Sequence, residues 1–436
     1  MTESYLEKLV PEKDYACLLE GRAQLFFQLA NTLRRARDER WSKRLYFELW
    51  SEADALESFL DDYGARWNRT YNYFTELAAS VRGFAMGGLS LEHLSRRIAG
   101  YRVLDSLPPR EARSARDALE SARAFVQSSL VTFIDGLRDE ACALGLALPS
   151  ACFPKEHFDE DVERFSLPRN VGQEEIADEA QRIAAVASKY LQVCAMLDEL
   201  KIRPLASAEA REAWLLQHCT EEQARVYEAS VHNLQSAYDT HVKNTVLEAE
   251  DERLPRLRGH VSSALHMLEA VTQLTHFVER HESGVRTAAA ERRLQGLVSR
   301  ADVQRVALDE LLCWAHRLLS AGRELAEALL PAYTNVQTLK VSLGDGITVH
   351  ARPAALIVAI VNHHGTPVEM ELCSQRCNAG SILELMILVG SHPEERCFAF
   401  HGDQHPLRDI GLLFEGQLGE RGIEMLPPEL SYLRHR

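Results

Sequence analysis

The chain is 436 residues long, enough for two or three domains, and its 46% hydrophobic and 26% charged residues are typical of a globular protein. No stretch reaches the roughly 18 consecutive apolar residues of a membrane-spanning helix, and the acidic start lacks the pattern of a signal peptide. We therefore expect no membrane span. The formal net charge of −15 repels nucleic-acid backbones, so we also expect no nucleic-acid partner.

The nine cysteines are scattered along the chain, and their odd number does not fit a closed disulfide framework. Cys373, Cys377 and Cys397 lack the spacing of a zinc site with a fourth ligand. We therefore expect reduced thiols, no metal and no cofactor, in a cytoplasmic protein.

Residues 1 to about 333 follow the helical period. An apolar stripe from Leu45 to Ala78 predicts one helix of some ten turns that ends at Gly83. The pair Gly87-Gly88 then breaks the chain, and Ser90 caps a shorter helix. A faint likeness of Gly87–His93 to a phosphohistidine loop is set aside, because the Ser-His pair is interrupted.

Further stripes predict helices over about 115–144, 183–200, 220–242 and 255–278, and a last long helix that reaches Leu330. The segment Thr220–Gln223 has the form of a capping box. Residues 146–172 contain three prolines and little periodicity, which indicates a long connection. Long helices joined by short turns favour an elongated antiparallel bundle or two sub-bundles.

At about residue 334 the pattern changes from helical to mixed. Alternating apolar residues predict strands over 337–343, 367–373 and 396–401, with a short fourth strand possible before the turn at Asn378–Gly380. Helical stripes fall at 352–362, 381–390 and 406–418. This order predicts an α+β domain over 334–422 with helices on one sheet face, followed by a tail, 423–436.

His350 stands directly before the helix that Ala351-Arg352-Pro353 opens. Proline suits a first helical turn, where its missing N–H has no intrahelical partner. The N–H groups of Ala351 and Arg352 then point outward, and such a helix start binds anions through these donors and its positive dipole end. Arg352 adds a cation suited to phosphate oxygens. An imidazole in this place can attack a phosphoryl group, although a histidine that only caps the helix fits the same pattern.

The run His350-Ala-Arg-Pro-Ala-Ala355 resembles the active-site signature of HPr, the histidine-containing phosphocarrier protein of the bacterial phosphotransferase system. The order of predicted elements matches too. The segment Gly380–Met386 (GSILELM) resembles the HPr segment whose serine is phosphorylated by a regulatory kinase in many bacteria. The resemblance covers residues 336 to 420, and the helical region resembles no family that we recognise.

The resemblance implies that His350 accepts the phosphoryl group and that Ala351 and Arg352 hold the phosphate. It implies that Ser381 is a regulatory phosphorylation site for a serine kinase. The apolar residues of the second helix would form the surface that docks partners, namely Ile382, Leu383 and Met386. The implied donor is an enzyme I that is charged by phosphoenolpyruvate. Such a domain is a phosphoryl carrier and not an enzyme, and it needs no cofactor.

The sequence also departs from the HPr pattern. Ile347-Thr348-Val349 replaces the usual Asn-Gly-Leu before the histidine, and Ala359, Asn362 and Glu384 stand where basic residues are common. Residues 336–436 hold 8 basic and 12 acidic residues, a net charge of −4. An acidic domain is steered less well towards the acidic face of enzyme I. These departures point towards regulation instead of ordinary sugar transport.

Two further signals are interpreted as structural. The pair His363-His364 is expected to be a solvated helix end, and His276 and His281 lie near a helix end without the surroundings of a kinase box.

We therefore predict a multidomain protein, with an N-terminal all-α elongated helical bundle and a C-terminal α+β, HPr-like open-faced sandwich. The first hypothesis is a phosphocarrier or phospho-signalling protein that is charged on His350. The alternative is a regulatory module whose helical region binds an unknown protein, with His350 and Ser381 as switches.

Overall fold

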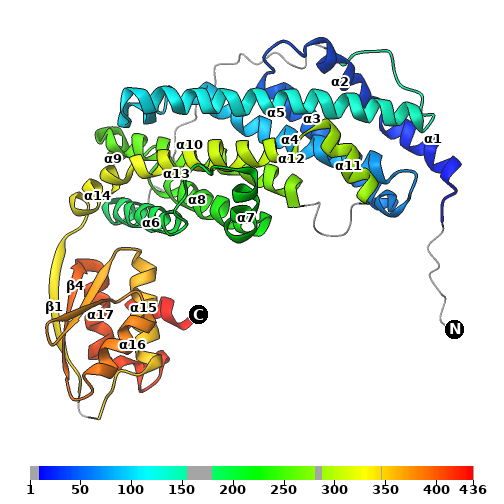
Figure 1. The fold of residues 1–436 in the computed structure, drawn as a ribbon. Helices are drawn as coiled ribbons and strands as arrows, with labels where there is room; N and C mark the ends of the chain where they lie inside the picture. The colour runs from blue at the N-terminus through cyan, green and yellow to red at the C-terminus, as the bar shows by residue number, and fades with distance from the viewer. Residues whose placement is uncertain (1–8, 155–178, 280–286, 345, 436) are drawn as a thin grey trace, which may run out of the picture. The chain divides into compact units, whose positions relative to one another are not determined.

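The computed structural model describes residues 9–154, 179–279, 287–344 and 346–435, and its contacts divide the chain into two compact units (Figure 1). In its described residues, the first unit contains helices and connecting segments but no strand. Its helices are α1 (Glu12–Arg22), α2 (Gln24–Arg35), α3 (Lys43–Asp62), α4 (Asn72–Arg97), α5 (Pro109–Ala143), α7 (Ala208–His218), the larger parts of α8 (Glu221–His241) and α10 (Arg253–Glu279), α11 (Ala288–Leu297), α12 (Arg300–Gln304), a π-helical segment (Arg305–Leu312) and α13 (Cys313–Ala321). Within the described ranges, no helix is long and apolar enough to cross a membrane.

Close packing at glycines brings the helices of the first unit together. A Cβ atom at Gly88 of α4 would lie 2.7 Å from Cδ1 of Tyr46 on α3, so only glycine admits this contact. The Phe84 ring of α4 meets Phe133 of α5 and Phe277 of α10 edge-on, with centroids 5.1 and 5.2 Å apart. Buried aromatic contacts of this kind dominate core energetics.

The single helix expected from Leu45 to Gly83 is wrong. The chain leaves α3 at Asp62, turns through Gly64 with a φ of 65°, makes a short 3-10 turn at Ala65–Trp67 and enters α4 at Asn72. The expected break at Gly87-Gly88 and the cap at Ser90 are also wrong, because all three residues lie inside α4 and are buried.

The single long helix expected to reach Leu330 is wrong, because the chain leaves the helical conformation at Val298-Ser299 and again at Gly322, and α11, α12, the π-helical segment, α13 and α14 (Arg323–Ala332) replace it. The predicted capping box is confirmed. Thr220 and Gln223 form the capping box that opens α8: the Thr220 hydroxyl accepts from the Gln223 N–H at 3.3 Å, and the Gln223 side chain accepts from the Thr220 N–H at 2.9 Å. Of the expected connection 146–172, residues up to 154 lie without helix or strand, and the rest lies outside the described residues.

The second unit contains α6 (Glu179–Glu199), the remaining ends of α8 and α10, α9 (Val246–Glu250), α14 (Arg323–Ala332) and a small sheet domain. The helical region therefore contributes to both units. The elements of the domain are β1 (Val336–Ser342), α15 (Ala351–His364), β2 (Val368–Leu372), β3 (Gln375–Asn378), α16 (Ile382–Ser391), β4 (Cys397–Asp403) and α17 (Gln404–Glu415). This is the α+β order that the sequence predicts, including the short extra strand.

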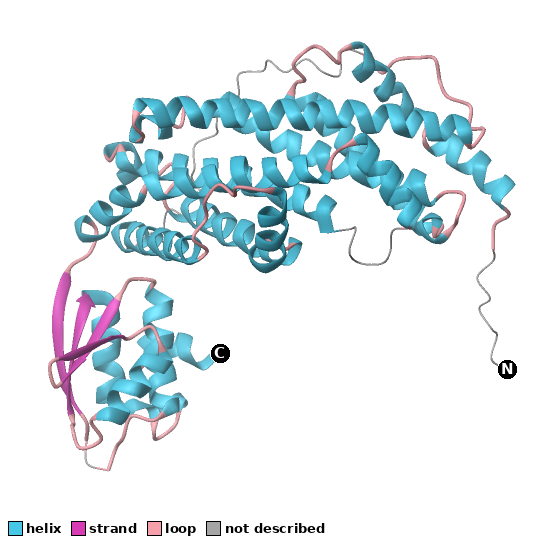
Figure 2. Cartoon of the chain, in the orientation of Figure 1, coloured by secondary structure: helices cyan, strands magenta, loops and turns pink. Residues whose placement is uncertain are grey.

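The four strands form one antiparallel sheet in the order β1-β4-β2-β3, and the three helices cover one of its faces (Figure 2). Val368, Met370 and Leu372 point into the core, each about 1% exposed, as their alternation predicts. Met370 pairs with Phe400 of β4, which is fully buried. The domain is therefore an open-faced sandwich with its core between sheet and helices.

Residues expected to form a tail belong to this core. Short 3-10 turns at Ile423–Met425 and Pro428–His435 place Leu430 and Leu433 in the same apolar cluster as α15 and α17. Tyr432 donates to Asp409 at 2.9 Å. The domain thus extends beyond residue 422.

The sequence predicts that His363 and His364 form a solvated helix end, and this prediction is wrong for His364. The His364 side chain is 8% exposed, and its Nε2 lies 2.8 Å from Oδ2 of Asp409. The ring of His363 stacks on Tyr432 with centroids 3.7 Å apart.

Candidate functional site

His350 is the N-cap residue of α15. Its backbone is extended, with a φ of −116°, and its carbonyl accepts the first helical hydrogen bond, from the Ala354 N–H at 3.0 Å. Its ring Nδ1 accepts from the Arg352 N–H at 3.4 Å. The side chain remains 51% exposed. The imidazole therefore lies at the positive end of α15 and is open to a partner.

The other ring nitrogen of His350 is held by a carboxylate. Nε2 lies 2.9 Å from Oε1 of Glu420, which follows the last helix of the domain. A tautomer with its proton on Nε2 satisfies both contacts, since Nε2–H donates to Glu420 while Nδ1 accepts from the backbone of Arg352. The ring lone pair is then on Nδ1, at the helix start.

The turn that carries Glu420 is placed by its backbone. Gln417, Leu418 and Gly419 all have positive φ values, of 54°, 54° and 70°, and Leu418 is 1% exposed and anchors the turn in the core. The Arg352 guanidinium donates to the Gly419 carbonyl at 3.3 Å. Arg352 thus touches both the turn and, through its backbone, the His350 ring.

Ala351 lies exposed at the first position of α15, where the N–H of a helix has no intrahelical partner. Ala351 and the Arg352 N–H therefore lie next to His350 at the start of α15. The structure therefore brings together the three residues expected at the phosphate position. Glu420 was not found from sequence, because it lies 70 residues away and no motif contains it.

Ser381 is the N-cap residue of α16. Its hydroxyl accepts from the Glu384 N–H at 3.3 Å, while the Glu384 carboxylate accepts from the Asn378 N–H at 3.0 Å. Gly380 donates to the Asn378 side chain at 2.8 Å. The serine is therefore held at a second helix start of the same domain, on the surface side of a local hydrogen-bond network.

The apolar residues expected on the docking surface differ in exposure. Ile382 is 43% exposed and Leu383 is 68% exposed, whereas Met386 is partly buried and packs on the core. Ile387, one turn after Leu383, is 59% exposed and was missed in the sequence reading. Three large apolar side chains therefore lie open on a ten-residue helix, which is unusual for a surface without a partner.

A separate polar cluster lies between helices of the first unit. The rings of His93 and His266 are 4.5 Å apart, Lys43 Nζ lies 2.9 Å from His93 Nδ1, and His266 contacts Glu269 at 2.9 Å. Burial, with repulsion from His266 and Lys43, lowers the pKa of His93 to about 4. The cluster borders a pocket of about 520 Å³ that no sequence motif indicates. Within the described residues, no three His, Cys, Asp or Glu side chains form a metal-binding group.

The sheet order, the helices on one face and the histidine at a helix start define the C-terminal domain as an HPr-like domain. In agreement, residues 337–403 match the family described as PTS HPr component, phosphorylation site. His350 and the Ser381 segment lie within this match, while Glu420 lies beyond it. No curated protein and no solved structure matches the chain.

Proposed function

We propose that this protein is a phosphocarrier or phospho-signalling protein that is charged on Nδ1 of His350. The observation that carries the proposal is the position of this ring, with Nδ1 at the start of α15 and Nε2 against Glu420. The family of the matching domain has a carrier role, in which the domain accepts a phosphoryl group and does not act as a catalyst, and this supports the proposal.

The donor in this proposal is an enzyme I that carries a phosphohistidine made from phosphoenolpyruvate. The Nδ1 lone pair of His350 attacks phosphorus, and the bond from phosphorus to the donor nitrogen breaks, so that the electron pair leaves with the donor. The proton on Nε2 of His350 stays in place. The phosphoryl oxygens then meet the Arg352 guanidinium and the first-turn N–H groups of Ala351 and Arg352.

Docking and regulation use the neighbouring helix in this proposal. Leu383, with Ile382 and the partly buried Met386, would contact the donor and the acceptor. Phosphorylation of Ser381 by a serine kinase would add about two negative charges beside these apolar residues and weaken docking.

A second candidate function follows from the acidity of the domain. With a net charge of −4 over residues 336–436 and Glu384 on the docking helix, encounter with an acidic enzyme I is slowed. The alternative is a regulatory module in which His350 and Ser381 switch the binding of a protein partner by the helical region.

One experiment tests the carrier. The full chain, its His350→Ala variant and the matched His392→Ala variant are incubated with enzyme I and labelled phosphoenolpyruvate. We expect acid-labile label on the wild type and on His392→Ala only. Label that survives in His350→Ala, or no label on the wild type, would sink the proposal. Onward transfer to a sugar-system acceptor favours the carrier, and charging without transfer favours the switch.

A further inference from the structure

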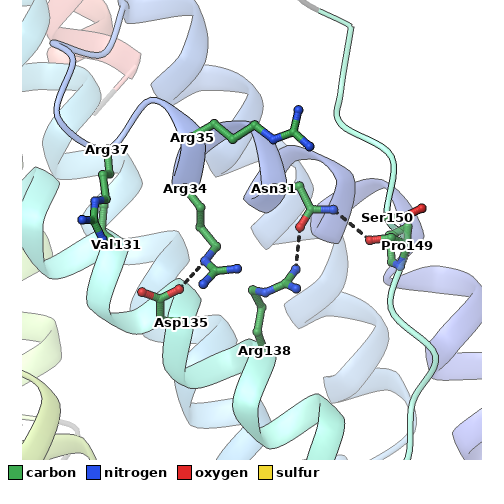
Figure 3. Close-up of a pocket in the computed structure, with 9 residues that line it drawn as sticks. All are labelled: Asn31, Arg34, Arg35, Arg37, Val131, Asp135, Arg138, Pro149 and Ser150. Carbon is green, nitrogen blue, oxygen red and sulfur yellow. Dashed lines mark hydrogen bonds and ion pairs between the residues drawn. The ribbon is translucent and has the colours of Figure 1, made fainter.

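Four arginines gather around one pocket of the first unit, in a chain that is strongly acidic overall. Arg34, Arg35 and Arg37 come from the end of α2 and the turn after it, and Arg138 comes from α5 (Figure 3). The lining contains one carboxylate, Asp135. The side chains that line the pocket thus carry a net charge of +3, from four arginines and one aspartate.

Arg138 is oriented in this pocket by a neutral group. Its Nη1 donates to Oδ1 of Asn31 at 2.7 Å, and the Asn31 amide in turn donates to the carbonyls of Pro149 and Ala151 at 2.8 and 2.9 Å. The two bonds from the Asn31 amide nitrogen fix the orientation of the amide, so that its oxygen faces Arg138. A guanidinium has five N–H donors, so this contact positions Arg138 while leaving its charge and most of its donors for another group.

The remaining arginines are also available to a ligand. Arg34 contacts Asp135 at 2.5 Å, but both side chains are more than 40% exposed, and exposed pairs of this kind contribute about 0–1 kcal/mol. Arg35 has no ion pair with any residue that the structure describes, and Arg37 reaches only the exposed Asp38, at 3.6 Å. A ligand anion with two charges can therefore compete for these groups.

The pocket has the size of a small-molecule site. Its volume is about 370 Å³, within the range of roughly 300–1,000 Å³ that ligand pockets show. The helices α2 and α5 form two walls of the pocket, and the extended segment at Pro149 and Ser150 forms a third (Figure 3). Several fork-shaped guanidinium donors fit a phosphate better than a carboxylate, because a phosphate offers three acceptor oxygens.

We propose that this pocket, lined by Arg34, Arg35, Arg138 and Ser150, binds the phosphate monoester of a small soluble molecule. Arg138 binds the phosphate directly, Arg35 adds a second cation, and Asn31 is a positioning residue. The site is independent of His350 and gives the helical region a ligand of its own.

Calorimetric titration of the full chain with glucose 6-phosphate tests the proposal, with glucose as the uncharged control. We expect a Kd below about 1 mM for the phosphate ester, weaker binding at higher salt, and no binding of glucose. The variants Arg138→Gln and Arg35→Gln should each weaken binding at least about tenfold. Arg116→Gln, an exposed arginine on α5 outside the pocket, should bind like the wild type.

Three results would overturn the proposal. The first is no binding of glucose 6-phosphate to the wild type at millimolar concentration. The second is unchanged binding in Arg35→Gln, which leaves the bonds of Asn31 and Arg138 intact and should keep the thermal unfolding midpoint of the wild type. The third is binding to vesicles that contain phosphatidic acid, or to a phosphoserine peptide, at least tenfold more tightly than to the sugar phosphate.

Discussion

Glu420 holds His350 from a position 70 residues further along the chain, with Oε1 2.9 Å from the ring Nε2. The contact reaches the histidine from the turn after α17, while the start of α15 reaches it from the other side. Both nitrogens of the imidazole therefore have defined neighbours, and they have opposite roles.

Removal of this carboxylate should slow the charging of His350. Glu420→Ala leaves Nε2–H without its acceptor, so that the two tautomers of the ring exchange more freely. We expect a rate about twofold to fivefold lower, because an exposed pair is worth about 0.2–1 kcal/mol. This decrease is measured as the rate at which enzyme I transfers labelled phosphate to the protein. Glu415→Gln, which changes an exposed charge at the end of α17, is the control, and a faster rate in Glu420→Ala would contradict this role.

The exposed leucine of α16 should matter for docking and little for folding. Leu383→Ala changes a side chain that is 68% exposed, so the free energy of unfolding should stay within about 0.5 kcal/mol. The KM of enzyme I for this protein should rise severalfold. Leu385→Ala is the matched control: this side chain is fully buried, and its loss should cost about 2–5 kcal/mol. An unchanged KM in Leu383→Ala would show that α16 does not dock the donor.

Ser381 should stabilise the start of α16. Ser381→Ala removes the acceptor for the Glu384 N–H and should cost about 0.5–2 kcal/mol, while Ser381→Asp should keep the cap. The domain contains no tryptophan, so amide hydrogen exchange within residues 382–391 is the appropriate measurement. Equal exchange in Ser381→Ala and the wild type would exclude the cap as a contributor to stability.

The half-buried His93 should make the first unit sensitive to mild acid. The pKa of His93 in the folded protein, about 4, lies below its ordinary value of 6.5. Between pH 4 and 6.5, His93 is therefore protonated in the unfolded chain but largely neutral in the folded protein. Stability should therefore fall as the pH drops from about 6.5 towards 4, by roughly 1–2 kcal/mol after allowance for the exposed part of the ring. Urea unfolding at pH 7.5 and 5 measures this change. His93→Gln should reduce the difference, and an equal difference would assign it to other groups.

The contact of Gly88 with Tyr46 should tolerate no side chain. Gly88→Ala places a methyl group 2.7 Å from the ring carbon Cδ1, and the forced shift of α3 and α4 should cost about 1–3 kcal/mol. Gly296→Ala on α11 meets no atom within 4 Å, so its stability should stay equal or rise by up to about 1 kcal/mol. Thermal unfolding followed by circular dichroism compares the two, and an equal midpoint for Gly88→Ala and the wild type would contradict the packing.

The sheet domain could be predicted from sequence because each element has one buried face. The alternation of Val368, Met370 and Leu372 is visible locally, and so is the helix start after His350. The break at Gly64 could not be predicted, because Tyr63 and Trp67 continue the apolar spacing of α3 in the sequence, although both side chains are exposed in the structure. The glycines of α4 were misread, because the chain carries no local sign that Gly88 lies against another helix.

The same limit applies to the sites. A helix start is a local property, which is why Ala351 and Arg352 could be named in advance. Glu420 and the pocket at Arg138 depend on residues that only the folded chain brings together. The structure supplies these contacts through positive-φ turns and through the extended segment at Pro149.

The sheet order has a consequence for how this domain folds. Among the strands that the structure describes, β1 pairs only with β4, so that Val336 meets Asp403 across 67 residues (403 minus 336). Closing a loop of this length costs chain entropy before any contact repays it, and topologies with such distant pairings fold slowly. The domain should therefore be a late and cooperative folding unit, in which the helix start at His350 gains its carboxylate neighbour only after the sheet has closed.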